Sequence, residues 1–112
     1  MLKSKIHRAT LTGTELDYEG SITIDENLLE KADILPGEQV YVLNINHGER
    51  FITYTIAAPR GSGTELLNGP VAKRGMVGDR IIILSYCQVS AEKANDLKAR
   101  VVFTDDDNRP KE

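Results

Sequence analysis

The pair Gly20-Ser21 is the point in the sequence where the residue types suggest covalent chemistry. A serine hydroxyl can attack the carbonyl carbon of the residue before it and turn that peptide bond into an ester. β-Elimination then cuts the chain and leaves dehydroalanine, which loses ammonia on hydrolysis and becomes a pyruvoyl group. Glycine suits the position before the serine, because it has no Cβ to block the attack and tolerates strained dihedral angles. Taken alone, however, a Gly-Ser pair between two strand-like segments is more often a hairpin turn.

A pyruvoyl group at Ser21 would supply decarboxylase chemistry to a chain with no other evident catalytic machinery. Its ketone forms a Schiff base with a substrate amine, and the neighbouring carbonyl accepts electrons as the pyridine ring does in pyridoxal enzymes. We expect neither a metal nor pyridoxal phosphate, since the sequence has one cysteine, Cys87, and no cluster with zinc-ligand spacing. His47 and Cys87 have no visible catalytic partner, and we interpret them as a surface and a core residue.

Strands dominate the elements that must position these residues. Alternating apolar and β-branched residues predict strands over residues 6–12, 16–24, 40–45, 51–57, 65–67, 80–87 and 101–103. The Asn and Gly residues of segment 46–49 favour a hairpin between two of these strands, and Asn68-Gly69-Pro70 is a second predicted turn.

Helices and tail are minor parts of the prediction. Asp25 can cap a short helix over residues 26–32, and a second short helix is predicted over residues 90–97. The charged residues 104–112 are expected to form a frayed tail after the folded domain.

Two segments of the chain share a pattern. Residues 35–43 (LPGEQVYVL) match residues 76–84 (MVGDRIIIL), each with a turn glycine, an acidic residue and an apolar strand. Two such halves would close on each other as a small pseudo-symmetric barrel. Gly-acid turns before strands are common, so the sequence leaves the duplication open.

Length and charge restrict the class of protein. The chain has 112 residues, the size of one domain, and a formal net charge of -3. Contacts to phosphate dominate nucleic-acid affinity, so a mildly acidic chain without a basic stripe argues against nucleic-acid binding. The sequence has no apolar stretch of the length of a signal peptide or membrane span, so we expect a cytoplasmic protein without a membrane partner.

Several motifs together resemble one family. KIHR at residues 5–8 and YEGSITID at 18–25 resemble the N-terminal signature of bacterial pyruvoyl-dependent aspartate 1-decarboxylases. NHGERFITY at 46–54, RGS at 60–62, LNG at 67–69 and VGD at 77–79 follow in the family's order and spacing. Each motif is weak alone, but the set covers the chain up to about Phe103.

The resemblance implies a mainly β fold, a double-psi β-barrel with short helices, in one domain over residues 1–103 with residues 104–112 as its tail. It implies an enzyme precursor that cleaves itself between Gly20 and Ser21 into chains 1–20 and 21–112. The mature enzyme would convert L-aspartate to β-alanine and CO2 for pantothenate and coenzyme A biosynthesis. The family also implies a homotetramer with active sites between neighbouring subunits.

Family positions assign roles to individual residues. Ser21 would become the pyruvoyl group that forms the Schiff base, and Gly20 would supply the attacked carbonyl. Tyr54 resembles the family's proton donor; a phenol has an ordinary pKa of about 10 and therefore carries a proton at neutral pH. Without the family, Tyr54 would be interpreted as a half-buried strand aromatic.

The resemblance also implies a set of substrate contacts. Arg50 would hold a substrate carboxylate, as a guanidinium can do with two hydrogen bonds, with Lys5 as a second cation. His7 would also contact the substrate and would share a strand face with Lys5. Thr53 would contact the substrate and take part in self-processing; a regular strand would point it away from Tyr54, so this role would need a bulge or a strand end. Without the family, these basic residues would be interpreted as solvated surface charges.

The segment Asn68-Gly69-Pro70-Val71 resembles the family's substrate-binding turn. The family usually has small alanine residues after Asn-Gly, and Pro70 removes one backbone donor from this turn. The detail of substrate contact at Pro70 and Val71 therefore differs from the family pattern.

Two other functions stay open. The same pyruvoyl chemistry could serve another amino acid, because Arg50 and Lys5 favour a dicarboxylate without separating aspartate from glutamate. Small barrels with paired Gly-acid turns also resemble swapped-hairpin DNA-binding regulators, a non-catalytic class that the acidic net charge disfavours.

Overall fold

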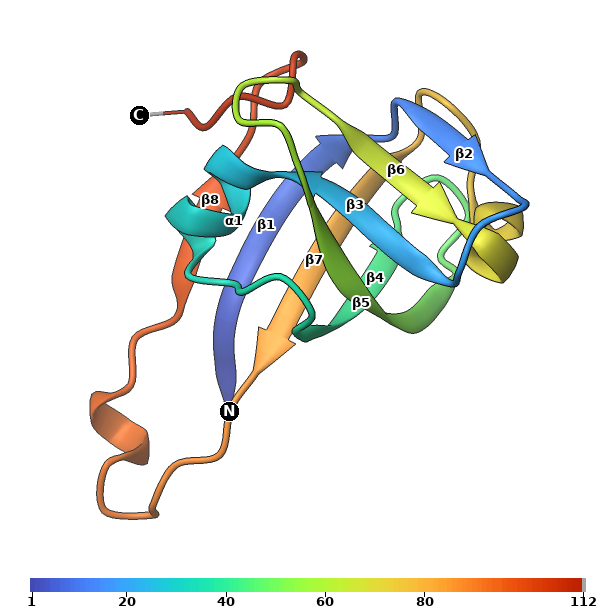
Figure 1. The fold of residues 1–112 in the computed structure, drawn as a ribbon. Helices are drawn as coiled ribbons and strands as arrows, with labels where there is room; N and C mark the ends of the chain where they lie inside the picture. Colours follow the sequence, from blue (N-terminus) through green and yellow to red (C-terminus); the bar gives the residue numbers. More distant parts are fainter. Residues whose placement is uncertain (112) are drawn as a thin grey trace.

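The computed structural model describes residues 1–111, which contain eight strands and three short helices (Figure 1). The strands are β1 (Leu2–Thr10), β2 (Gly13–Glu15), β3 (Ser21–Asp25), β4 (Gln39–Asn44), β5 (Arg50–Ala58), β6 (Glu65–Asn68), β7 (Arg80–Tyr86) and β8 (Arg100–Phe103). The helices are α1 (Glu26–Ala32) and two 3-10 helices, η1 (Gly69–Arg74) and η2 (Ala94–Asp96). Within residues 1–111, no helix is both long enough and apolar enough to cross a lipid bilayer.

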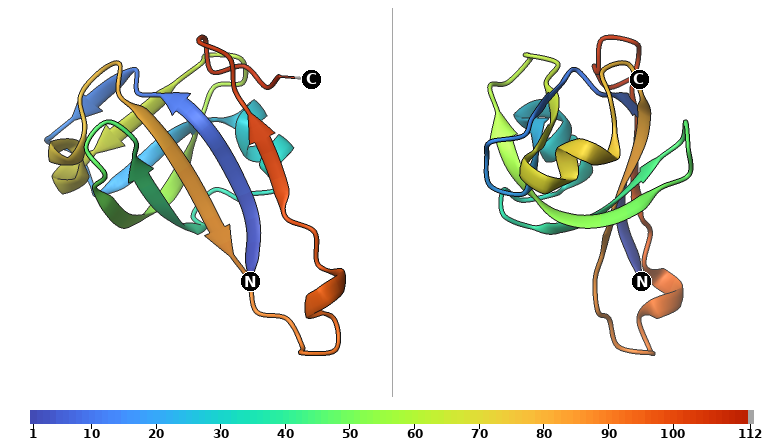
Figure 2. Two further views of the ribbon diagram at one scale, coloured as in Figure 1. Left: turned by 180° about the vertical axis from the view of Figure 1, so that it is seen from behind. Right: turned by 90° about the vertical axis from the view of Figure 1, so that its right-hand side faces the viewer.

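The strands form one mixed sheet in the order β2-β6-β3-β5-β4-β7-β1-β8. Pairs β3–β6, β4–β5, β4–β7 and β1–β7 are antiparallel, whereas β2–β6, β3–β5 and β1–β8 are parallel. Figure 1 and Figure 2 show that the sheet curves around a common interior, with α1 beside β8 and residues 87–99 projecting away from it. The mainly β prediction is therefore confirmed.

The interior is filled by aliphatic side chains from most of the sheet and from α1. The largest fully buried apolar residues are Ile6, Leu11, Ile22, Ile24, Leu28, Leu29, Val40, Val42, Leu67, Ile81 and Ile83. On β3 the apolar Ile22 and Ile24 alternate with Ser21, Thr23 and Asp25, as the two-residue period of a strand requires, and all but Thr23 are buried. The polar side chains of β3 thus lie on the face opposite Ile22 and Ile24.

Helix α1 has the predicted bounds and the predicted cap. The Asp25 carboxylate accepts a hydrogen bond from the backbone N–H of Asn27 at 2.8 Å, and the helix ends at Asp33 in the left-handed conformation. Leu28, Leu29 and Ala32 are its buried residues. Helix α1 therefore covers the end of β3 that lies away from Ser21.

The two matching segments have the same local structure. Gly37 and Gly78 have φ angles of 87° and 95°, a region that favours glycine. Glu38 and Asp79 each accept a hydrogen bond from the backbone N–H three residues earlier, at 3.2 and 3.1 Å. The N–H of each glycine donates to a residue on or just after another strand, Thr55 of β5 or Leu11 beyond β1, at 2.8 and 2.9 Å. These shared bonds support two related halves.

The predicted strand over residues 16–24 is wrong in its first half. Residues 16–20 form a loop between β2 and β3, and Leu16 and Tyr18 are exposed. Their alternation has the period of a strand, but no neighbouring strand pairs with them. Strand β6 lies between β2 and β3, so Gly20-Ser21 is not a hairpin turn.

The C-terminal part also differs from the prediction. Residues 90–97 contain only the 3-10 helix η2, and Asn68-Gly69-Pro70 leads into η1 rather than forming a simple turn. Residues 104–111 are not frayed, because Asn108 is buried and its side chain bonds to Thr10 and Gly63 at 2.7 to 2.8 Å. Glu112 lies outside the described residues.

Candidate active site

Ser21 is the first residue of β3 and is fully buried. It pairs with Asn68, the last residue of the antiparallel neighbour β6. The Asn68 Nδ2 donates hydrogen bonds to Ser21 Oγ at 2.9 Å and to Thr23 Oγ1 at 2.7 Å. Ser21 Oγ in turn donates to the carbonyl of Glu19 at 3.3 Å. The hydroxyl is thus held against the backbone that precedes it.

The loop of residues 16–20 packs on the start of η1. Gly69 is buried and has a φ of 66°. The position of a Cβ on Gly20 would lie 3.5 Å from Pro70 Cδ, which is ordinary van der Waals contact. The peptide that would be cleaved therefore lies between the β6–η1 junction and the first residue of β3.

Tyr54 lies beside Ser21 in the sheet. The parallel pair β3–β5 places Ile22 opposite Thr55, so Ser21 and Tyr54, one residue earlier on each strand, are neighbours at the usual spacing of about 4.8 Å. Tyr54 is 36% exposed, which leaves its side chain accessible from outside the barrel. Ser21, Asn68 and Tyr54 thus form a row across β6, β3 and β5.

Thr53 is not part of this row. It pairs with the fully buried Val40, and the pairings of β5 contain no register shift that would turn it toward Tyr54. Within one chain, Thr53 therefore lies on the opposite strand face, as a regular strand predicts.

Arg50 shares the outward face with Tyr54 at the other end of the exposed part of β5. It is exposed, pairs with Leu43, and makes no ion pair with another residue of 1–111. Four residues of strand separate it from Tyr54, a distance of about 13 Å. A guanidinium side chain can cover part of that distance toward a substrate at Tyr54.

Lys5 and His7 lie on β1, four strands away from β3 in the sheet order. They alternate with the buried Ser4 and Ile6 and so share the outward face, as predicted. Four strand spacings correspond to roughly 19 Å measured along the sheet. The structure therefore does not bring Lys5 or His7 to Ser21 within one chain.

His7 has its own packing partner. Its ring meets the ring of Phe103 edge to face, with centroids 5.5 Å apart. Burial, together with the positive charges of Lys5 and Arg8, lowers the pKa of His7 below its ordinary value. The ring is therefore mostly neutral at pH 7.

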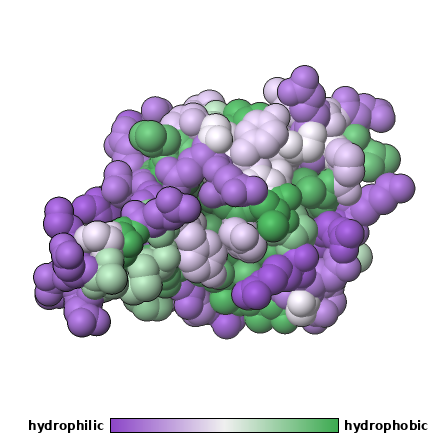
Figure 3. Space-filling view, turned by 90° about the horizontal axis from the view of Figure 1, so that it is seen from below, coloured by the Kyte–Doolittle hydropathy of each residue, from purple (hydrophilic) through white to green (hydrophobic). Residues whose placement is uncertain are grey.

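The outward face between Arg50 and Lys5 is largely apolar. One row of paired residues crosses it: Ile52, Tyr41, Leu84, Lys5 and Val101. Ile52 and Val101 are 50% and 43% exposed. Figure 3 shows hydrophobic residues gathered among hydrophilic ones on the underside of the molecule.

Sequence reasoning missed the most deeply buried acid. Glu65 is fully buried, pairs with Ile24, and neither carboxyl oxygen has a hydrogen-bond partner in residues 1–111. Burial, with a smaller contribution from Asp25, raises the pKa of Glu65 well above its ordinary value. Its burial could have been predicted from its position two residues before the inward Leu67, because residues two apart on a strand share a face.

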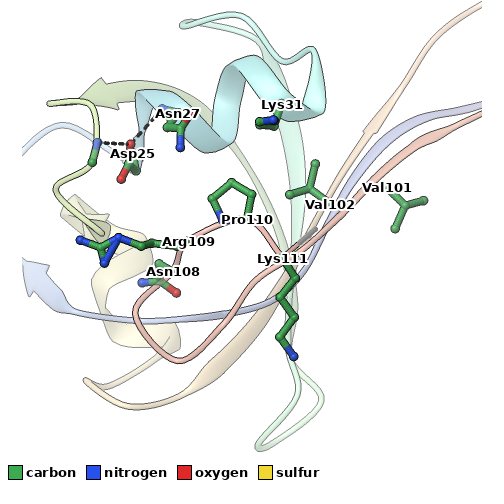
Figure 4. Close-up of a pocket in the computed structure, with 10 residues that line it drawn as sticks. Asp25, Asn27, Lys31, Val101, Val102, Asn108, Arg109, Pro110 and Lys111 are labelled. Carbon is green, nitrogen blue, oxygen red and sulfur yellow. Dashed lines mark hydrogen bonds between the residues drawn. The ribbon is translucent and has the colours of Figure 1, made fainter.

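A cavity of about 540 Å³ lies elsewhere, between α1, β8 and the last residues (Figure 4). Asp25, the last residue of β3, lines it, and its carboxylate accepts the N–H groups of Gly61 and Gly63 at 3.0 and 2.8 Å. This cavity is at the far end of β3 from Ser21. Among the described residues, no group of three His, Cys, Asp or Glu side chains is arranged to hold a metal ion.

The fold resembles a designed barrel. A crystal structure of the rationally designed protein mkDPBB_sym_86 superimposes with a TM-score of 0.52, covering 73% of this chain and 95% of that one at 14% identity. The class of the protein is thus a double-psi β-barrel, with a buried serine, an asparagine and a tyrosine aligned across β6, β3 and β5.

The particular family follows from the sequence comparisons. The family model for aspartate decarboxylase matches residues 1–111. The aspartate 1-decarboxylase of Thermoanaerobacter pseudethanolicus is 56% identical over 98% of this chain and 94% of its own length. That of Caldicellulosiruptor saccharolyticus is 54% identical over 97% of this chain and 85% of its own. The chain belongs to the aspartate decarboxylase family of enzymes.

Proposed function

We propose that the chain cleaves itself between Gly20 and Ser21 and, with the resulting pyruvoyl group, decarboxylates L-aspartate to β-alanine and CO2. Family membership supports the substrate and the reaction. The observation that carries the proposal is the Ser21 hydroxyl, buried at the start of β3 directly after a loop and held by Asn68 at 2.9 Å. A serine that only ended a turn would not need a buried amide donor.

Cleavage needs no reagent other than water. Ser21 Oγ forms a bond to the Gly20 carbonyl carbon, the C–N bond breaks, and the hydroxyl proton ends on the freed amine. Loss of the Ser21 Cα proton then breaks the Cβ–Oγ bond and releases Gly20 as a carboxylate. Water adds to the remaining dehydroalanine and ammonia leaves. Gly20 has no side chain to obstruct the attack, and the Asn68 N–H stabilises negative charge that develops on Oγ.

The residues around Ser21 fit a pyruvoyl group. Once formed, the group would supply a ketone that condenses with the substrate amine and an electron sink for the bond that loses CO2. Tyr54 lies one strand away with an accessible side chain, suited to return a proton to the substrate carbon. Arg50, exposed on the same face, would hold the substrate carboxylate that is retained.

We further propose a homotetramer in which neighbouring chains complete each site. Lys5 and His7 are too far from Ser21 within one chain, and the face between Arg50 and Lys5 has an apolar row that a second copy would cover. A neighbour would also exclude water from the reacting group. We expect the enzyme in the cytoplasm, supplying β-alanine for pantothenate and coenzyme A.

Intact mass under denaturing conditions tests the cleavage. We expect chains 1–20 and 21–112, with the longer one lighter by one ammonia than a chain that starts with serine. Ser21→Ala should stay full length and release no β-alanine. A wild-type chain that stays intact after prolonged warming would contradict the proposal.

The substrate is tested separately on the cleaved enzyme. L-aspartate should give β-alanine and CO2, while L-glutamate at the same concentration should react at least about a hundredfold more slowly, because a site shaped for one chain length misplaces the other. Comparable rates would contradict the substrate assignment and leave the cleavage intact.

A further inference from the structure

We infer that Gly69, backed by Pro70, is a steric stop that holds the scissile loop in the conformation required for cleavage. The inference rests on the proposed self-cleavage and concerns maturation rather than substrate binding. It gives the β6–η1 junction a role in making the catalytic group.

The contact between Gly69 and the loop is between backbone atoms. A Cβ built on Gly69 would lie 2.4 Å from the carbonyl oxygen of Tyr18, 2.8 Å from the Gly20 nitrogen and 2.9 Å from the carbonyl carbon of Glu19. Real Cβ atoms essentially never come within 3.0 Å of such atoms. The backbone of three successive residues before Ser21 therefore rests against the Gly69 Cα, and only glycine permits this approach.

Three consecutive residues contact different parts of the scissile peptide and its surroundings. Asn68 holds the Ser21 hydroxyl, Gly69 lies against the backbone of Glu19 and Gly20, and the Pro70 ring borders Gly20. Pro70 is at the start of η1, where its fixed φ suits the helix and its missing N–H leaves no bond unmade. The nucleophile and the bond it attacks are thus fixed by one short, stiff segment.

The rest of the loop has little else to hold it. Residues 16–19 are exposed, and they belong to neither β2 nor β3. The bond between Ser21 Oγ and the Glu19 carbonyl, at 3.3 Å, is long. The contact at Gly69 is therefore the main restraint on how the Gly20 carbonyl is oriented relative to the Ser21 hydroxyl.

Gly69→Ala tests the stop, and Gly61→Ala is its matched control. Both glycines have positive φ, 66° and 79°, so both variants carry a similar backbone strain. A Cβ at Gly61 meets nothing within 4 Å, whereas at Gly69 the loop must move by about 1 Å. A misplacement of about 1 Å at a reacting centre slows a reaction by roughly a hundredfold.

Cleavage is followed by intact mass on freshly purified precursor, with thermal unfolding measured in parallel. Hydroxylamine added under denaturing conditions cuts the ester between Gly20 and Ser21 and so reports how much of it has formed. We expect Gly69→Ala to cleave roughly a hundredfold more slowly than Gly61→Ala and to contain less ester. A folded Gly69→Ala that cleaves as fast as Gly61→Ala would overturn the inference.

A second variant covers the case in which Gly69→Ala does not fold. Pro70→Gly keeps space for the loop but loosens the stop, and Pro36→Gly makes the same change in an exposed turn. We expect cleavage of Pro70→Gly to slow roughly tenfold relative to Pro36→Gly, and equal rates would overturn the inference. A wild-type chain that never cleaves would contradict the proposed function itself. Cleavage rates that are unchanged by substitution at both Gly69 and Pro70 would contradict only the role of Gly69 as a steric stop.

Discussion

At the scale of single residues, the Asn68 amide links two strands by holding two hydroxyl groups of β3. Its Nδ2 group reaches both Ser21 and Thr23, within 2.9 and 2.7 Å. No ionisable side chain of residues 1–111 is hydrogen-bonded to Ser21 Oγ, so the amide is the polar side chain in contact with the proposed nucleophile. In the proposed cleavage, the amide would therefore orient the hydroxyl and stabilise charge on it, but its Nδ2 group could not accept the proton.

Asn68→Ala should slow cleavage by roughly 100-fold to 1,000-fold, the usual effect of removing one donor from a developing oxyanion. The rate is measured by intact mass on fresh precursor. Asn46→Ala, an exposed asparagine in the β4–β5 turn, serves as the control and should cleave like the wild type. Equal rates for the two variants would show that Asn68 is not needed by the hydroxyl.

Glu65 makes stability depend on pH. Burial raises its folded-state pKa above an unfolded value of about 4.3, so the carboxyl contributes fully to stability only below that value. As the pH rises toward the folded pKa, the unfolded chain loses its proton first, and the free energy of unfolding falls by about 1.4 kcal/mol per pH unit. Glu65→Leu removes this loss.

Urea unfolding at pH 5 and pH 8 tests this, with Ser21→Ala as the background so that every sample is one intact chain. The advantage of Glu65→Leu over its parent should be larger at pH 8 than at pH 5. Glu15→Leu, an exposed acid on β2, should show no such trend. If Glu65→Leu keeps the parent's pH dependence, the carboxyl is ionised in the folded chain.

At the scale of elements, the sequence was sufficient to predict an element whose interacting residues lie close together in the chain. Asp25 and the apolar face of α1 lie within one short segment, and the prediction was confirmed. Residues 16–20 have a strand's alternation, but a strand also needs a neighbour, and β6 pairs with β2 and β3 on either side of that loop. Asn108 was missed because its partners, Thr10 and Gly63, are far away in sequence.

The family pattern assigns roles to single residues, but it does not give their arrangement in space. Ser21, Asn68 and Tyr54 are brought together by strand pairing that no periodicity reveals. Lys5 and His7 were correctly predicted to share a strand face, yet the sheet order separates them from Ser21.

Asn108→Ala should release the C-terminal segment. The side chain accepts the Thr10 N–H at 2.7 Å and donates to the carbonyls of Thr10 and Gly63 at 2.8 Å each, so three bonds are lost. We expect the free energy of unfolding to fall by about 2–3 kcal/mol, because buried backbone groups are left unpaired. Asn95→Ala in η2, where the residue is exposed, should change stability little. Similar urea midpoints for the two variants would show that residues 104–111 add no stability.

At the scale of the whole molecule, the positions of the charged residues are informative. The chain has a net charge of -3, yet Arg50 and Lys5 border an apolar part of the outward sheet face. Their strands are three positions apart, about 14 Å measured along the sheet. A single small dicarboxylate cannot bridge both cations and Ser21 on one chain. A second chain packed on this face would bring the missing cation to the substrate.

Mixed assemblies test this directly. Lys5→Ala should bind aspartate weakly and Ser21→Ala should lack the pyruvoyl group, so each alone has low activity. Because Lys5 lies four strands away from Ser21 in its own chain, we expect a site to combine Ser21 from one chain with Lys5 from another. Co-expression at equal levels should then restore roughly a quarter of the wild-type sites.

The control pair is Ser21→Ala with Tyr54→Phe: Tyr54 is next to Ser21 in the same chain, so this mixture should stay inactive. Native mass spectrometry verifies that mixed tetramers form in both cases. Mixed tetramers of the Lys5 pair that remain as inactive as the parents would show that Lys5 does not act across the interface.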